Sequence, residues 1–286
     1  MKSHLKVVYN RDKRAAPALL NIDSLSVGFT TTNGCVSVLQ DVSFSVDQGE
    51  IVCILGRSGC GKTTLLNLLA GFLKPDIGSV QLAGKNVDGP GTNRCVVFQE
   101  NALFPWLTVR ENIDFGLQQR GFNKKQRNIE VERFIELVGL AGYADHLPEE
   151  ISGGMKQRVA LARVLILAPE VLLLDEPFAA LDAQTRGEMQ LLLMQLSRKL
   201  SHTVLFVTHD IEEALLLADR ILILDKASKG IKCIIDVTLP RYRSKQDQLF
   251  VRMNRELTEI LKAPSESCDV KDCAQCPPAG GDAHNL

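Results

Sequence analysis

Hydrophobic positions along the chain fall into short runs, and their spacing changes repeatedly between the strand period and the helix period. Residues 20–29 and 36–46 alternate apolar with polar side chains, which predicts two antiparallel strands that each bury one face. Shorter and more continuously apolar runs predict further strands. These predicted strands cover residues 50–55, 79–82, 94–98, 171–174, 203–207 and 220–224.

Predicted helices alternate with these strands. Apolar residues recur at the helix period over residues 64–70, 184–200 and 211–218, and over a long stretch at 108–167 that is interrupted at Gly121, Gly142 and Pro148. Strands that alternate with helices predict the α/β class, with a parallel sheet at the core. We expect an antiparallel β subdomain from the first strands and a helical subdomain inserted at about residues 100–162.

Polar segments flank this predicted domain, which we place at residues 19–240. Residues 1–18 are basic but contain no apolar core of signal-peptide length, so we expect a disordered leader. Residues 241–286 form a C-terminal extension, with one amphipathic helix expected at 246–262 and a polar tail. No uncharged apolar stretch is long enough to span a bilayer, so any membrane association is expected to come through a partner.

The composition of the chain is that of an ordinary globular protein and excludes few classes of function. The chain has 286 residues, 45% of them hydrophobic, which supports a sizeable core, and its net charge of −1 gives no reason to expect a nucleic-acid partner. Five of the eight cysteines are scattered, several of them in apolar runs, as expected for small buried side chains in a reducing compartment. Cys268, Cys273 and Cys276 lie in the polar tail, and their spacing leaves open a metal or redox site or a disordered tail without such a role.

A glycine-rich turn follows the strand at residues 50–55 and precedes the helix at 64–70. Its sequence fits G-x-x-x-x-G-K-[ST] at every fixed position, which a chance turn with these flanks would not do. Backbone N–H groups of such a turn, together with a helix N-terminus, bind phosphate. Lys62 is expected to reach the terminal phosphates, and Thr63 to offer its hydroxyl to Mg²⁺.

Other candidate residues follow the remaining buried strands, where open α/β sheets bind their ligands. Asp175 and Glu176 end one strand; a carboxylate there suits Mg²⁺, and its neighbour could activate an attacking water. His209 follows the next strand, where contact with a γ-phosphate is favoured over a purely structural role. Gln99 ends a fourth strand and could contact both the metal and the water.

A second signature, Ile151-Ser152-Gly153-Gly154-Met155, precedes a helical run. With the phosphate loop and the acidic strand end, it gives residues 20–240 a resemblance to the ATP-binding subunits of ABC transporters. The resemblance implies a P-loop NTPase core and identifies Gln99 with the Q-loop, residues 180–182 with the D-loop and His209 with the switch histidine. Two departures are mild: the fifth signature position is Met155 in place of glutamine, and the D-loop begins with alanines.

The resemblance also implies ATP and Mg²⁺ as ligands and a dimer that encloses two ATP molecules. Each ATP would lie between the phosphate loop of one chain and the signature of a second, which we expect to be an identical copy. Expected catalytic residues are Glu176, His209, Gln99 and Lys62, and expected metal ligands are Thr63, Gln99 and Asp175. The residues expected to contact ATP are Phe29 (by stacking on adenine), Gly56, Arg57, Ser58, Gly59, Cys60, Gly61, Lys62, Thr63, Thr64, Ser152, Gly153 and Gly154.

A narrower resemblance, carried by residues 80–99 and 103–112, is to the nitrate/sulfonate/taurine group of bacterial importers, with the taurine type the most similar. It implies integral membrane permease subunits as partners, a periplasmic or lipid-anchored binding protein acting through them, and a place on the cytoplasmic face of the inner membrane. The segment after Gln99 is where such proteins dock the permease, so Trp106 is either exposed for that partner or packed into the helical subdomain. The alternative function is a soluble ABC ATPase that acts on nucleic acid or ribosomes, but such proteins usually carry two cassettes or long insertions.

Overall fold

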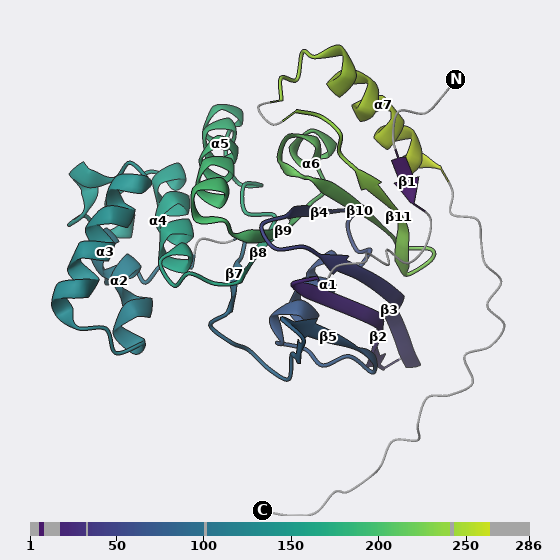
Figure 1. Ribbon diagram of the computed structural model, residues 1–286, viewed down its shortest axis with the longest axis horizontal. Coiled ribbons are helices and arrows are strands. Elements are labelled where there is room, and N and C mark those ends of the chain that lie inside the picture. Colours follow the sequence, from purple (N-terminus) through teal and green to yellow (C-terminus); the bar gives the residue numbers. More distant parts are fainter. Residues whose placement is uncertain (1–5, 9–17, 33, 100–101, 241–242, 264–286) are drawn as a thin grey trace, which may run out of the picture.

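The computed structural model describes residues 6–8, 18–32, 34–99, 102–240 and 243–263. Its described part contains two sheets and a lobe of helices (Figure 1). The larger sheet has seven strands in the order β1-β11-β10-β4-β9-β8-β7. These strands are β1 (Lys6–Val8), β11 (Gly230–Asp236), β10 (Arg220–Asp225), β4 (Ile51–Leu55), β9 (Thr203–Thr208), β8 (Val171–Asp175) and β7 (Arg94–Val97).

Five of these strands, from β10 to β7, pair in parallel, as the alternating pattern predicts. Strands β11 and β1 add an antiparallel edge that the sequence analysis does not predict. Within residues 1–18, for which the sequence predicts a basic leader, the structure describes residues 6–8 as a strand that pairs with β11. Three residues are too few for a periodic signal, and their partner strand lies more than two hundred residues away in the sequence.

The second sheet is antiparallel and has the order β3-β2-β5-β6. Its strands are β3 (Gly34–Val46), β2 (Leu20–Thr31), β5 (Ile77–Leu82) and β6 (Lys85–Asn86). The expected antiparallel subdomain is therefore present, and β6 is a short strand outside the predicted strand ranges. Helix α1 (Lys62–Ala70) packs between the two sheets, because Leu65 and Leu69 share one core with Phe44 of β3 and Val207 of β9.

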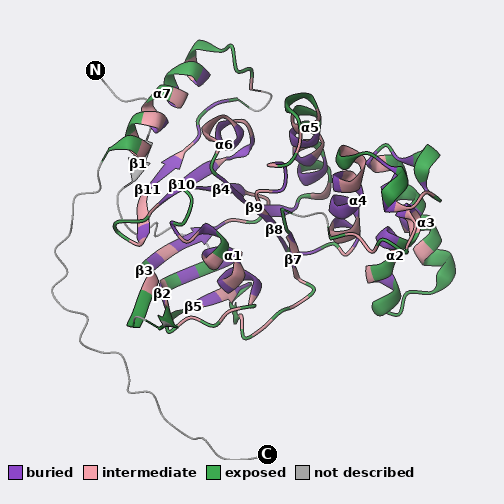
Figure 2. Cartoon of the chain, turned by 180° about the vertical axis from the view of Figure 1, so that it is seen from behind, coloured by how far each residue is buried: buried purple, intermediate pink, exposed green. Residues whose placement is uncertain are grey.

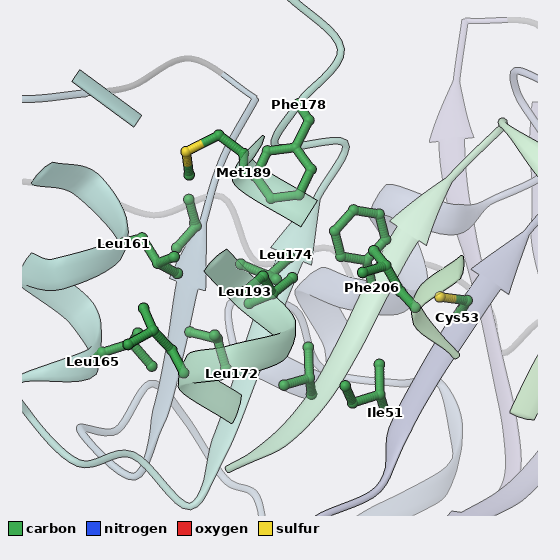
Figure 3. Packing of buried hydrophobic residues seen from close by; sticks show 14 of the residues in the cluster. Ile51, Cys53, Leu161, Leu165, Leu172, Leu174, Phe178, Met189, Leu193 and Phe206 are labelled. Carbon is green, nitrogen blue, oxygen red and sulfur yellow. The ribbon is translucent and has the colours of Figure 1, made fainter. Parts of the chain in front are cut away.

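The remaining helices pack on the opposite face of the large sheet or form the lobe. The lobe contains α2 (Val109–Gln119), α3 (Lys124–Leu137), α4 (Gly153–Leu165) and the short 3₁₀ helices Ala141–Tyr143 and Pro148–Glu150. Helix α5 (Ala183–Leu200) packs into the same core cluster as strands β8 and β9, and Figure 3 shows its Met189 beside Phe178 and its Leu193 beside Leu174. Helix α6 is Ile211–Leu217.

The C-terminal extension contributes α7 (Gln248–Lys262), which confirms the expected amphipathic helix. Its apolar face, Phe250, Met253 and Leu257, is buried in the core of the large sheet, whereas its outer face is exposed (Figure 2). Lys232 of β11 donates to the carbonyls of Ile260 and Ala263 at 2.8 and 2.6 Å, and so satisfies the end of the helix. The extension is therefore part of the folded core as far as residue 263.

Candidate nucleotide site

The phosphate loop lies between β4 and α1. Gly61 caps α1 in the left-handed region, with φ of 100°, and provides no side-chain hydrogen bond to the first turn. Because Gly61 has no side chain, it does not cap the first amides of α1. A bound anion such as phosphate can accept from these amides instead. Arg57, Ser58 and Gly59 are exposed, whereas Cys60 is buried and Thr64 is half-buried. The loop is thus open on one side.

Lys62 lies inside this loop and is 7% exposed. Its Nζ donates to the carbonyls of Gly56 at 3.0 Å and Arg57 at 3.4 Å, and lies 3.6 Å from Oε1 of Glu176. The ammonium group thus occupies the position between the loop and the acidic strand end. A bound phosphate would replace these contacts with a stronger charge partner.

The parallel register explains why the loop and the acidic residues meet. Leu55 pairs with Thr208 and Asp175 pairs with Val207, so β4, β8 and β9 end at the same edge of the sheet. At this edge, Thr63 hydrogen-bonds the carboxylate of Asp175. Burial raises the pKa of Asp175, and the hydrogen bond from Thr63 opposes that rise.

Glu176 and His209 are in direct contact. Nδ1 of His209 lies 2.8 Å from Oε2 of Glu176, while the other oxygen of Glu176 faces Lys62. Glu176 adopts a φ of 44°, in the region that favours glycine, and its amide donates to the carbonyl of Val207 at 3.0 Å. A non-glycine residue in this conformation costs on the order of 1–3 kcal/mol, and such strain is concentrated at functional sites.

Together these residues border a hollow of about 440 Å³. Its lining includes Gly56, Lys62, Glu176 and His209, as the sequence analysis leads us to expect, and also Leu261 from the last turn of α7. Leu261 is far from the phosphate loop in the sequence, so no local pattern predicts this proximity.

Other expected site residues lie elsewhere. Ser152, Gly153 and Gly154 do not line the hollow, and Ser152 instead caps α4, with its Oγ accepting from the amide of Met155 at 3.3 Å. Phe29 is on β2 of the antiparallel sheet and is 40% exposed. Gln99 is exposed just beyond β7. The three tail cysteines lie outside the described residues, and the described part of the chain holds no cluster of three or more metal-binding side chains.

Fold and site together define a nucleoside-triphosphate-binding protein of the P-loop type. Residues 39–179 match the profile of the family described as ABC transporter. The chain is 43% identical over 243 residues to the uncharacterized ABC transporter ATP-binding protein MJ0412 of Methanocaldococcus jannaschii, covering 85% of this chain and 91% of the relative. It therefore belongs to the ABC transporter family, as an ATP-binding ATPase.

Two further relatives carry specific names. The nitrate import ATP-binding protein NrtD of Synechocystis is 39% identical, with 85% of this chain and 95% of NrtD aligned. The taurine import ATP-binding protein TauB of Pelagibacter ubique is 47% identical, over 70% of this chain and 76% of TauB.

Solved structures share the fold. CbiO1 of Clostridium perfringens, part of the transporter complex cbiONQ, superposes with a TM-score of 0.72 at 26% identity, over 86% of this chain and 95% of CbiO1. A dimeric post-hydrolysis structure of the cassette MJ0796 with ADP and Pi superposes at 0.67 and 27% identity, over 77% of this chain and all of MJ0796. These similarities confirm the expected ABC ATPase fold with its antiparallel and helical subdomains.

Proposed function

We propose that this chain is the ATP-hydrolysing subunit of a bacterial ABC importer that takes up a small oxyanion or organosulfonate through a separate membrane permease. The observation that carries the proposal is the 47% identity to a protein named for taurine import, supported by the 39% identity to one named for nitrate import. No helix among the described residues is both long and apolar enough to span a membrane. The proposed location is the cytoplasmic face of the inner membrane, reached through the permease.

Within the site, the loop amides and Lys62 hold the phosphates, and Glu176 is the general base that accepts a proton from the attacking water. His209 orients Glu176 through its 2.8 Å contact and faces the γ-phosphate. The Thr63 hydroxyl and the Asp175 carboxylate are hydrogen-bonded neighbours, and two adjacent hard oxygen ligands fit Mg²⁺, with Gln99 as a further ligand. When bound, Mg²⁺ neutralises charge on the phosphates.

The site is completed by a second copy of the chain. The first turn of α4 presents Ser152 and Gly153 exposed at a helix N-terminus, which is a second place for phosphate oxygens. Because these residues do not line the hollow of their own chain, we assign them to the ATP bound by the partner. The dimeric form of MJ0796 supports this arrangement.

A group of aromatic side chains marks the proposed permease contact. Trp106 is 72% exposed, which favours the interpretation of Trp106 as a partner contact over packing into the helical subdomain. Its ring lies 5.6 Å from that of Phe104, which in turn lies 4.5 Å from the ring of Phe115. An exposed aromatic cluster of this kind is typical of a protein interface.

The test is co-expression with candidate permease subunits from the same genome, followed by membrane isolation. Wild-type chain should co-purify with the permease, and Trp106→Ala should reduce recovery while leaving ATP hydrolysis by the isolated chain intact. Ile77→Ala is the matched control, because Ile77 is 65% exposed on the antiparallel sheet, away from the aromatic group. Recovery only with nucleic acid or ribosomes would support the alternative of a soluble ABC ATPase and refute the proposal.

A further inference from the structure

A buried carboxylate lies beneath the switch histidine, and the roles proposed above do not use it. Glu213, in the first turn of α6, is 6% exposed. Its Oε2 accepts from the hydroxyl of Thr208 at 2.6 Å, and its Oε1 accepts from the amide of Gln190 at 3.0 Å. Burying a carboxylate is costly unless its oxygens are hydrogen-bonded, and here both are. Glu213 therefore ties together the end of β9, the start of α6 and the middle of α5.

This network fixes the backbone on both sides of His209. Thr208 precedes the histidine and accepts, through its Oγ1, from the amide of Asp210 at 3.0 Å. Asp210 follows the histidine and caps α6 by accepting from the amide of Glu212 at 2.8 Å. The ring of His209 itself is exposed at 63%, so packing does not hold it. Its direction toward Glu176 is set by the two residues beside it.

A second contact joins the same segment to the D-loop, residues 180–182. Arg186 of α5 donates from Nη2 to the carbonyl of Leu181 at 3.0 Å, and its Nη1 lies 4.0 Å from Oδ2 of Asp210. One guanidinium group thus touches the D-loop and the residue after the switch histidine. A cavity of about 50 Å³ lies beside these contacts, and its lining includes Glu176, His209, Arg186 and Glu213.

We propose that Arg186, Gln190 and Glu213 are positioning residues that couple the D-loop to His209. The inference rests on the proposed function, in which Glu176 is the general base and His209 orients it. Glu213 and Gln190 hold Thr208, the residue before His209, and Arg186 lies between the D-loop and Asp210, the residue after it. The network thereby keeps the ring of His209 at 2.8 Å from Glu176.

Steady-state ATP hydrolysis by the full-length chain tests the coupling. Glu213→Ala and Arg186→Met should each lower kcat by about 10- to 100-fold, the range expected when a catalytic group is misplaced by about 1 Å. The KM for ATP should change by less than about threefold, because the phosphate loop that binds ATP is untouched. Glu213→Gln should restore most of kcat, since the amide can still pair with Thr208 and with a rotated Gln190.

Leu193→Val is the matched control, because Leu193 is a buried apolar residue of the same helix α5 and has no polar side-chain group that could join the network. Rates are compared per folded molecule, with the unfolding midpoint measured for each variant. The inference is overturned if Glu213→Ala and Arg186→Met lose no more kcat than Leu193→Val. If Glu213→Ala does not fold, Arg186→Met decides alone, since it leaves the buried carboxylate paired. A wild-type chain without ATP hydrolysis would instead refute the proposed function.

Discussion

Gly56, the first residue of the phosphate loop, has no room for a side chain. A Cβ at this position would lie 2.7 Å from the carbonyl oxygen of Leu224 and 2.6 Å from Sγ of Cys60. Ordinary contact begins at 3.4 Å, so the first distance is short by 0.7 Å. Leu224 belongs to β10 and pairs there with Ile231 of β11, and because its carbonyl is part of the backbone it cannot rotate away as the end of a flexible side chain could.

Gly56→Ala must therefore lift the loop away from β10. Overpacking of this kind costs about 1–3 kcal/mol of unfolding free energy. The displaced carbonyl of residue 56 would also lose its 3.0 Å bond from Lys62, so the phosphate cradle would lose its geometry. A shift of about 1 Å at a positioned site can cost on the order of 100-fold, and we expect a loss of that order in ATP affinity.

Urea unfolding and equilibrium ATP binding measure the two effects. Gly187→Ala is the control: this glycine is inside α5, and its added Cβ would meet nothing within 4 Å. The control should gain about 0.5–1 kcal/mol, because alanine loses less conformational freedom than glycine in a helix. If Gly56→Ala has the same unfolding free energy and the same ATP affinity as the wild type, the loop has room for a side chain at residue 56 and the prediction is wrong.

Three further predictions concern buried charges and thiols. Arg220 is 1% exposed and lies 3.0 Å from Glu50, so Arg220→Met should cost about 3–5 kcal/mol in urea unfolding by removing the cationic partner of that carboxylate, and a loss below about 1 kcal/mol would argue against it. Burial raises the pKa of Glu213, so the unfolded chain releases this proton first and stability falls as pH rises above the ordinary value of 4.5. Glu213→Gln should remove that part of the pH dependence in unfolding titrations, and an unchanged slope would contradict the assignment. Cys35 is exposed, whereas burial raises the pKa of the Cys60 thiol, so a thiol reagent should label Cys35 before Cys60 in peptide mapping, and labelling of Cys60 before Cys35 would be inconsistent with the structure.

Local patterns were sufficient for the phosphate loop. A strand, a glycine-rich turn and a helix adjoin in the sequence, and the structure has β4, the loop and α1 in that order. The meeting of Glu176 with His209 could also be expected, because both residues follow buried strands and parallel strands end at one edge. These predictions rest on short-range periodicity and on one rule of α/β topology.

Long-range pairings could not be predicted in the same way. Strand β1 pairs with β11, more than two hundred residues away in the sequence, and three residues are too few to show a period. The contact of Gln190 with Glu213 joins two helices, and a glutamate in a short amphipathic helix gives no sign that it points inward. Leu261 reaches the nucleotide hollow only because α7 folds back over β11 and α6. Each of these depends on tertiary packing and not on local sequence.

We propose that ATP joins two copies of this chain and that each copy completes the site of the other. Its most direct test is the mass of Glu176→Gln in solution, measured by light scattering with ATP and Mg²⁺, with ADP, and without nucleotide. Loss of the base should slow hydrolysis by about 10²- to 10⁴-fold and trap the ATP-bound state. We expect Glu176→Gln to be a dimer with ATP and a monomer with ADP or without nucleotide. Adding Ser152→Ala and Gly153→Asp to this variant should abolish the ATP-dependent dimer. A chain that binds ATP yet stays monomeric throughout would contradict it.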